Sequence, residues 1–262
     1  MSACSGSCDD LAVTSEHTVD GPELAGRPLP DDVVGLLAGL TTTRAIRAYR
    51  DEPVPDDALR ARLFAATRAP SGSNRQPFRF LVLTDGPGAR EAKALVGTAA
   101  RRAWGAKRVA DRYDSGSGAN ADSPKARVAR SMQRYVDNFE RVPVLVLPCL
   151  VRYRDPSPME GASVYPACQN LLLAARALGF GGVLTLWHSL VERELRTLLD
   201  IPDGAAVAAT ITIGRPVGAH GPVRRRPLDE LVFDDRWDQP PSWAVDPPGT
   251  RHTAAGPPGR QT

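Results

Sequence analysis

A short polar segment, Ala69–Phe80, has the composition best suited to holding a flat polar ligand. Gly72 would let the backbone approach a ligand closely, because glycine carries no Cβ. The hydroxyl and amide side chains around it are Ser71, Ser73, Asn74 and Gln76. Such groups donate and accept hydrogen bonds, which suits the sugar chain or the ring edge of a cofactor. An ordinary polar turn between a helix and a strand has the same composition, so both interpretations stand.

Two groups of arginines could bind a phosphate. Arg44 and Arg47 lie early in the chain, and Arg224–Arg226 lie near its end. Guanidinium groups bind phosphate through paired hydrogen bonds. If both groups converge with the polar segment, they would serve the phosphate, the polyol and the ring of a flavin mononucleotide (FMN). A solvated or ion-paired surface is the ordinary alternative for such a run of arginines.

The third candidate is Thr185–His188, at the end of an expected strand, where side chains can face a ligand. Trp187 or His188 could stack on a flat ring or contact a substrate. A single histidine at a strand end is more often a structural or surface residue, so no catalytic role is assigned to His188. With four histidines in 262 residues and no Gly-x-Ser-x-Gly pattern, hydrolysis by a Ser-His-Asp or Cys-His set has little support.

Composition limits the class of protein. A chain of 262 residues with 42% hydrophobic and 24% charged residues can bury the core of one globular domain. A net charge of +3 makes no case for a nucleic-acid partner. No stretch of about 20 apolar residues suggests a membrane span, and acidic residues rather than a basic start precede position 30. We therefore expect a soluble, cytoplasmic protein.

The four cysteines do not form a disulfide scaffold in a chain of this length. Cys149 and Cys168 fall in apolar segments and are expected in the core. Cys4 and Cys8 could bind a metal or form a redox pair, but few other ligands lie nearby and the surrounding residues are typical of a mobile tail. No metal site is therefore expected.

The chain divides into a domain and two ends. Residues 1–30 lack periodicity and are expected to be irregular, as is the Pro- and Gly-rich segment 238–262. The domain should span residues 31–237. Within it, the glycine- and serine-rich piece 114–122 is expected to be either a mobile flap or a solvated linker.

Hydrophobic periodicity predicts an alternation of helices and strands. Helices are expected over 31–40, from Asp56 to the polar segment, and over 88–104, 125–141, 162–178 and 190–200; strands are expected over 78–83, 142–151, 182–186 and 207–213. Gly179 can end one helix in the left-handed conformation. Phosphate-loop and dinucleotide-binding patterns are absent, since Gly179–Gly182 runs from helix into strand. The pattern favours an α+β sandwich with helices around a mixed, mainly antiparallel sheet.

Two segments in the first half of the domain resemble motifs of the nitroreductase-like flavoproteins. Thr43–Tyr49 resembles their basic RRSIRxF motif and is followed by Pro53-Val54-Pro55 and a helix, as in the family. Ala69–Phe80 resembles their APSGxNxQPWxF turn. Phe78 stands where that motif has tryptophan.

Two later segments resemble the same family in the same order. Tyr165–Gly182 resembles the xxxxQNLLLAAxALGLG helix. Gly214–Pro216 with Arg224–Leu228 resembles the GxP…RRPLEE ending. The resemblance covers residues 41–237 and is to NAD(P)H nitroreductases of the actinobacterial type. It implies the family's FMN-dependent α-β-α sandwich.

The resemblance further implies a homodimer with FMN at the subunit interface. Arg44 and Arg226, with Arg224, would contact the phosphate, and Arg47 would lie at the pyrimidine edge of the ring. The polar turn would serve the partner subunit's flavin. The implied cofactor-binding residues are Arg44, Ala45, Arg47, Pro70, Ser71, Gly72, Asn74, Gln76, Thr185, Leu186, Trp187, Arg224 and Arg226, and the implied substrate-binding residues are Trp187 and His188.

The N-terminal motif departs from the family pattern at two positions. Thr43 stands where the family has its first arginine, and Ala45 stands where it has serine. Two expected phosphate ligands are thereby absent. The arginine triplet Arg224–Arg226 offers a replacement for that charge.

The implied activity is ping-pong reduction of a small molecule. NAD(P)H would deliver hydride to FMN and leave, and a nitroaromatic, quinone or similar electron-poor acceptor would follow. A flavin also accounts for the absence of an evident protein acid, base or nucleophile. Dehydrogenases of peptide-derived heterocycles, reductive dehalogenases, flavin-destroying enzymes and non-catalytic flavin- or small-ligand-binding proteins stay open as alternatives. No motif separates NADH from NADPH.

Overall fold

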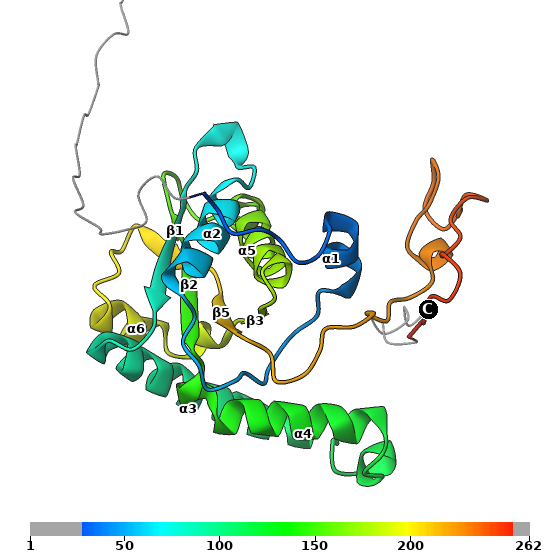
Figure 1. Ribbon diagram of the computed structural model, residues 1–262, viewed down its shortest axis with the longest axis horizontal. Helices are drawn as coiled ribbons and strands as arrows, with labels where there is room; N and C mark the ends of the chain where they lie inside the picture. The colour runs from blue at the N-terminus through cyan, green and yellow to red at the C-terminus, as the bar shows by residue number, and fades with distance from the viewer. Residues whose placement is uncertain (1–27, 254–262) are drawn as a thin grey trace, which may run out of the picture.

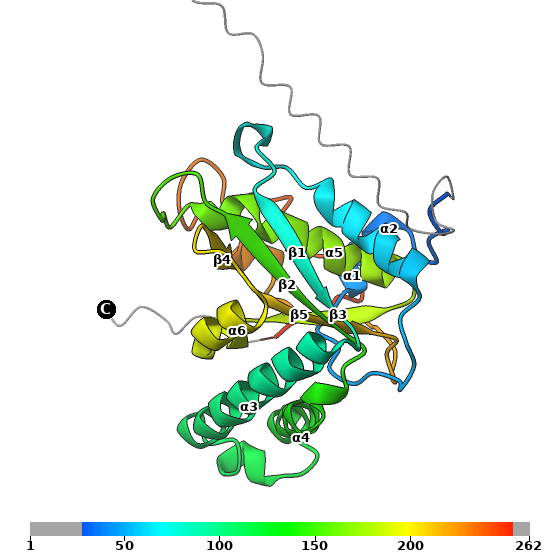
Figure 2. The same ribbon diagram turned by 90° about the vertical axis from the view of Figure 1, so that its left-hand side faces the viewer.

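The computed structural model describes residues 28–253 of the chain. The predictions for Cys4, Cys8 and most of residues 1–30 therefore lie outside the described residues, as do those for residues 254–262. Within the described range, helices cover both faces of one sheet (Figures 1 and 2). The expected α+β sandwich is confirmed.

Three helices lie on one face of the sheet: α1 (Leu36–Thr42), α2 (Asp56–Thr67) and α5 (Tyr165–Ala177) (Figure 2). Helix α2 begins where predicted, because Pro55 caps it in an extended conformation and two acids occupy its positive first turn. Helix α1 begins later than predicted. The backbone N–H of Val33 instead donates to Ala177 O at 2.7 Å, which ties that stretch to the end of α5.

The opposite face carries α3 (Pro87–Ala110), α4 (Pro124–Asp137) and α6 (Glu192–Leu198) (Figure 2). Helix α3 continues past its predicted end at residue 104, with Ala99, Ala100 and Trp104 buried along it. Helix α4 begins at a cap in which Ser123 Oγ accepts from Ala126 N at 3.0 Å. It ends earlier than predicted, and a 3₁₀ helix, Phe139–Arg141, follows.

The sheet contains β1 (Phe78–Leu83), β2 (Val144–Val151), β3 (Gly181–Thr185), β4 (Ala205–Val207) and β5 (Thr210–Gly214). The strand order is β1-β2-β5-β3, and β4 also pairs with β2. Every pairing of these strands is antiparallel, so within residues 28–253 the sheet is antiparallel rather than mixed. Strand β2 is buried on both faces, as its apolar sequence predicted.

The prediction of a single strand over 207–213 was wrong, because a bulge divides this segment into β4 and β5. Cys149 pairs with Val207, whereas Val146 pairs with Ile211, so the β4–β5 side holds one extra residue. The bulge lies opposite Pro148, which has no N–H to donate to the ladder. Ala208 N still donates to Pro148 O at 2.8 Å.

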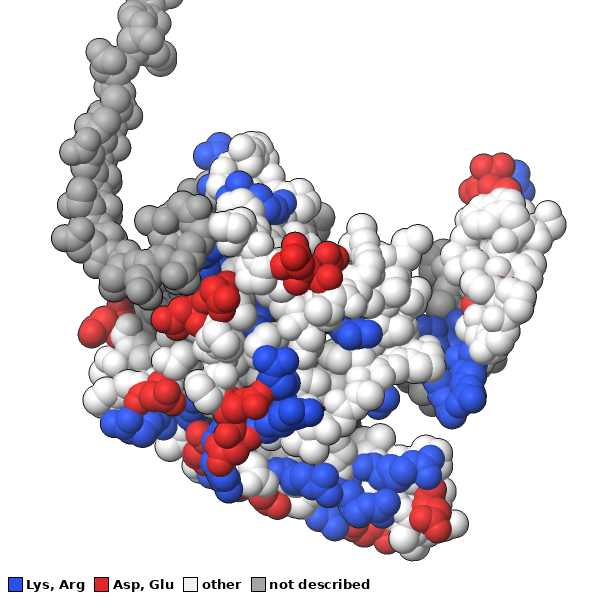
Figure 3. Space-filling model, in the orientation of Figure 1, with Lys and Arg blue, Asp and Glu red and all other residues white. Residues whose placement is uncertain are grey.

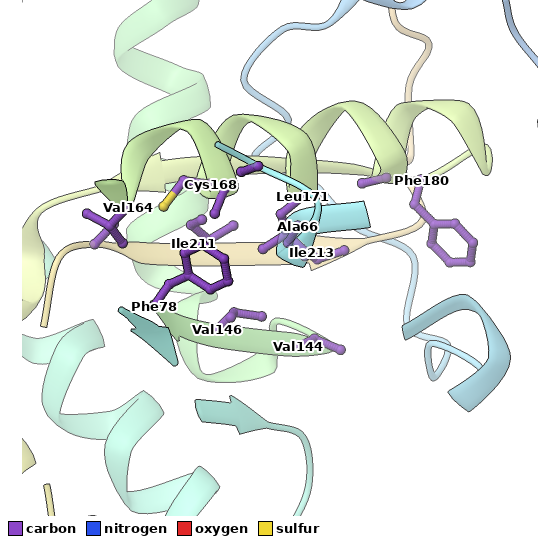
Figure 4. Close-up of a cluster of buried hydrophobic side chains, with 14 of the residues drawn as sticks. Ala66, Phe78, Val144, Val146, Val164, Cys168, Leu171, Phe180, Ile211 and Ile213 are labelled. Carbon is purple, nitrogen blue, oxygen red and sulfur yellow. The ribbon is translucent and has the colours of Figure 1, made fainter. Parts of the chain in front are cut away.

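The core between the sheet and α5 includes one of the predicted core cysteines. Figure 4 shows Cys168 and Leu171 of α5 beside Ile211 of β5 and Phe78 of β1. Cys149 packs on the other face, among the residues under α3. Both thiols are buried and free, and burial raises the pKa of Cys149 to about 11 and of Cys168 to about 12. Their predicted role as core residues is confirmed.

Two connecting segments complete the fold. Residues 111–123 join α3 to α4 and contain a 3₁₀ helix, Gly116–Ala119, so the predicted choice between flap and linker stays open. After β5 the chain forms an arm, residues 215–253, that runs away from the sheet (Figure 1, orange to red). Its regular structure is limited to a 3₁₀ helix, Leu228–Glu230, and isolated bridges. Gly179 has φ +74°, as its predicted capping role requires.

Candidate functional site

The segment Arg44–Arg50 is held along the edge of the sheet next to β3. Ile46 N donates to Gly182 O at 3.0 Å, and Arg50 N donates to Arg215 O at 2.8 Å. Ile46 is buried, whereas Arg44 and Ala45 are exposed. The backbone is thus fixed while the predicted cofactor-binding side chains are presented to solvent.

A buried chain of hydroxyls ties this segment to the sheet and to α4. Tyr49 Oη lies 2.8 Å from Thr212 Oγ1, and Tyr135 Oη lies 2.7 Å from the same atom. Tyr49 Oη also donates to Ile46 O at 2.6 Å. One arrangement of hydrogens satisfies all three contacts: Tyr135 donates to Thr212, Thr212 donates to Tyr49, and Tyr49 donates to the carbonyl. Burial raises the pKa of both phenols, so each keeps its proton.

The side chain of Arg47 lies on the side of this segment that adjoins α4. Its side chain is half-buried, and its Nε atom is buried without a hydrogen-bond partner among residues 28–253. It borders a cavity of about 310 Å³ that also contacts Tyr135 and Arg134 of α4. Because a buried N–H without an acceptor is costly, this position is suited to a ligand that supplies one.

The segment Thr185–His188 lies at the end of β3, as predicted. Leu186 is 54% exposed. The ring of Trp187 packs against Tyr135 and Phe139, with centroids 5.5 and 5.7 Å away. The indole therefore faces α4 and the 3₁₀ helix after it, and the predicted stacking of Trp187 on a ligand stays a prediction.

His188 is buried rather than at the surface. Its Nδ1 lies 3.2 Å from Thr210 Oγ1, and its backbone N donates to the same oxygen. Burial lowers the pKa of the imidazole, and the nearby Glu192 carboxylate partly opposes that shift. The residue borders a second cavity of about 400 Å³, shared with Leu186 and Tyr165. Its predicted contact with substrate stays a prediction.

The polar turn is exposed and conformationally strained. Ser73, Asn74 and Gln76 have φ of 51°, 51° and 49°, in the left-handed region that residues other than glycine rarely adopt. Two bonds hold this shape: Gln76 N donates to Ser71 Oγ at 2.9 Å, and Gly72 N donates to Ser163 Oγ at 3.2 Å. Strain of this kind, maintained in an exposed turn, is common at binding sites. Pro70 is exposed at its start.

The arginine triplet lies in the arm, residues 215–253. Arg224 and Arg225 are exposed, and Arg226 forms an ion pair with Glu230 in which Nε donates at 2.7 Å. Neither Arg44 nor the triplet Arg224–Arg226 borders the cavity at Arg47 or the cavity at His188.

One chain brings only part of the predicted site together. Arg47 and Trp187 both adjoin Tyr135, so the N-terminal arginine group and the segment Thr185–His188 meet at α4. The polar turn borders neither the cavity at Arg47 nor the cavity at His188. Such a separation is expected if the turn contacts a flavin bound to another subunit.

Sequence reasoning missed the contribution of α4 to this region. Tyr135 joins Arg47 to Trp187, and Arg134 and Arg141 border the same cavity as Arg47. The spacing of arginines along 127–141 places several on one helical face, which was a usable signal. Which residues that face meets depends on the fold.

Comparisons with known proteins found a matching family and several relatives. The family model described as "Nitroreductase family" matches residues 40–215. A relative from Archaeoglobus fulgidus, provisionally named an NADH dehydrogenase/NAD(P)H nitroreductase, is 31% identical over 185 residues, covering 69% of this chain and 84% of the relative.

Two further proteins with more specific descriptions are also similar. Nitrobenzene nitroreductase of Ectopseudomonas oleovorans is 29% identical over 197 residues, covering 65% of this chain and 82% of that enzyme. A provisionally named nitroreductase of Desulfovibrio desulfuricans, solved in complex with FMN, superposes with a TM-score of 0.56 at 27% identity. That superposition covers 78% of this chain and 98% of the solved chain.

Proposed function

The chain belongs to the nitroreductase family, and from that premise we propose that it is an FMN-dependent oxidoreductase using NAD(P)H. Nitroaromatics, quinones and related electron-poor molecules are the proposed acceptors, by analogy with relatives named as nitroreductases. The proposal is supported by a similar structure that contains FMN.

The buried Nε of Arg47 is the observation in this chain that best supports the proposal. Its buried Nε has no acceptor among residues 28–253, and the residue occupies the motif position implied to lie at the pyrimidine edge. The carbonyl oxygens at that edge of a flavin would supply the missing acceptor. The residues present therefore fit the cofactor.

The remaining predicted residues divide into three roles. Arg44, Arg224 and Arg226 would bind the phosphate, while the backbone of Thr185–Trp187 would line the ring. The strained turn is proposed to contact the flavin of a partner subunit, since it borders neither cavity described above. When bound, FMN would accept a hydride from NAD(P)H and pass electrons to the acceptor.

A homodimer is part of the proposal. Leu36 and Leu37 on α1 are 71% and 76% exposed, and Trp237 and Trp243 in the arm are also exposed. Apolar surface of this extent on a short helix and an extended arm favours burial against another chain. The structure contains no helix long and apolar enough to cross a membrane among residues 28–253. Location in the cytoplasm and the actinobacterial subtype stay predictions.

The absorbance spectrum of the purified protein tests this function. We expect the bands of an oxidised flavin, present on purification or after addition of FMN, and their loss on anaerobic addition of NADH or NADPH. A protein that shows no flavin and binds no added FMN would refute the proposal. Bound FMN that neither nucleotide reduces would instead favour a non-catalytic flavin-binding protein.

A matched pair of variants tests the role of Arg47. Arg47→Ala should weaken FMN binding or slow its reduction, because the positive charge at the ring edge is removed. Arg102→Ala, which removes an exposed charge from α3, should change neither quantity. FMN titration and stopped-flow reduction measure both, and equal behaviour of the two variants would exclude the assigned role.

A further inference from the structure

The cavity beside Arg47 lies between two walls that are distant in sequence. One wall is the segment Arg47–Asp51, and the other is the end of α4 with the 3₁₀ helix after it. The cavity has a volume of about 310 Å³. Its charged and amide side chains are Arg47, Arg50, Asp51, Arg134, Asn138 and Arg141. Figure 3 shows Lys and Arg side chains gathered over α4.

The cavity has more positive charge than its own residues neutralise. Asp51 is its single carboxylate, and it already accepts from Arg141 at 2.8 Å. The guanidinium groups of Arg50 and Arg134 form no hydrogen bond or ion pair within residues 28–253. Unpaired guanidinium groups around one cavity attract an anion, and they bind a carboxylate in a bidentate manner.

The cavity adjoins the region where the reaction is proposed to occur. Tyr135 forms part of its wall, and its ring also packs against Trp187, whose backbone is proposed to line the flavin. The Tyr135 hydroxyl is fixed by Thr212, so this wall has little freedom to move. An anion held here would lie one side chain away from Trp187.

This position suits the acceptor better than the electron donor. A substituted aromatic acceptor carries its carboxylate on the same ring as the group that is reduced, so the two are close together. The 2′-phosphate of NADPH is separated from the nicotinamide by two riboses and a pyrophosphate. A site that adjoins the flavin region therefore favours the acceptor's own carboxylate.

We propose that Arg134 and Arg50 form an anion-binding site that recognises a carboxylate on the electron acceptor. The consequence is a preference for carboxylate-bearing acceptors over neutral molecules of the same shape. This inference rests on the proposed flavin-dependent function and defines its substrate class more narrowly. Arg134 and Arg50 act as specificity-determining residues and do not take part in electron transfer.

The test compares two acceptors that differ in charge and hardly in shape. kcat/KM is measured with 4-nitrobenzoate and with 4-nitrobenzamide for the FMN-loaded enzyme. The ratio of the two values is then compared between the natural protein and Arg134→Gln. We expect the ratio to fall about tenfold, the scale of one solvent-accessible charge-assisted hydrogen bond.

Arg130→Gln is the matched control. Arg130 lies one turn earlier on α4, so the substitution changes the net charge equally. Its guanidinium donates to Ala121 O at 2.7 Å, and it borders a different cavity near Tyr113. We expect Arg130→Gln to leave the ratio unchanged, and a fall of equal size in both variants would reduce the effect to long-range charge and overturn the proposal.

Two other results would also overturn it. If Arg134→Gln lowers FMN affinity without changing the acceptor ratio, the cavity belongs to the cofactor. If the variant changes the NADPH to NADH ratio but not the acceptor ratio, the anion is the phosphate of the donor.

Calorimetric titration with benzoate and benzamide separates this inference from the proposed function. Neither molecule is reduced, so binding can be measured whether or not the protein carries flavin. Preferential binding of benzoate that Arg134→Gln weakens would support the site even if no flavin were found. Equal binding of the two probes to a protein that contains reducible FMN would refute the site and leave the proposed function intact.

Discussion

At the scale of single residues, the hydroxyl of Thr212 connects three parts of the molecule. It lies on the central strand β5 and touches the hydroxyls of Tyr49 and Tyr135, which come from the N-terminal segment and from α4. Both phenols are buried, so a phenol that lost its hydrogen bond to Thr212 could not bond to bulk water instead. The position of Arg47, two residues before Tyr49, therefore depends on a hydroxyl far away in sequence.

Thr212→Val should lower the free energy of unfolding by about 1–3 kcal/mol, because the hydroxyl of Tyr135 would keep no partner among residues 28–253. Urea unfolding measures this change. Thr197→Val makes the same chemical change on exposed α6, where the hydroxyl donates to Arg193 O at 3.2 Å. We expect that control to stay within about 0.5 kcal/mol of the natural protein. Similar losses in both variants would contradict the assigned importance of Thr212.

At the scale of elements, strand β3 positions the candidate site by allowing close packing at its start. A Cβ on Gly182 would lie 2.6 Å from Thr212 O and 2.9 Å from Leu172 Cδ2. The Gly182 carbonyl also accepts from Ile46 N at 3.0 Å. The absence of a side chain at this glycine thus lets β5, α5 and the N-terminal segment meet on one short strand.

Gly182→Ala should therefore destabilise the fold by about 1–3 kcal/mol, since the added methyl group must displace the backbone of β5. If FMN binds as proposed, less flavin should copurify with the variant, because the segment carrying Arg44 and Arg47 moves with β3. Gly204→Ala is the control, since a Cβ there meets no atom within 4 Å. Denaturant unfolding and flavin content per chain measure the two effects. Unchanged stability in Gly182→Ala would show that β3 tolerates a wider separation from β5.

At the scale of the whole molecule, parts of the proposed site are distributed between separate surfaces. The arm with Arg224–Arg226 runs away from the sheet (Figure 1), and the strained turn borders neither the Arg47 cavity nor the His188 cavity. Helix α1 exposes leucines beside the segment that carries Arg44. Association of two chains would cover these surfaces and could complete the site from both subunits.

If two chains associate and bind FMN as proposed, replacing Leu36 and Leu37 together with glutamate should give a monomer that retains little FMN. Charges placed at these positions, which are 71% and 76% exposed, would oppose burial while costing the single chain little. Light scattering and flavin content provide the measurements. Val109→Glu, at a position on α3 that is 78% exposed, should remain dimeric. A doubly substituted protein that stays dimeric with full flavin would place the interface elsewhere.

Sequence by itself determined the features that depend on local chemistry. Pro55 and the acids after it began α2, the apolar run of residues 144–151 formed the buried strand β2, and Gly179 adopted the left-handed conformation. Each follows from the conformational preference or hydrophobicity of a few neighbouring residues. The four family motifs likewise appear in sequence order and were readable without a structure.

Tertiary structure decided the features that depend on residues far apart in sequence. The bulge opposite Pro148 arises only when β2 pairs with the chain of β4 and β5. Trp187 faces inward because Tyr135 and Phe139 lie beneath it, and the basic cavity exists because α4 meets Arg47. No local preference encodes these contacts, since they are set by how helices and strands pack across the sheet.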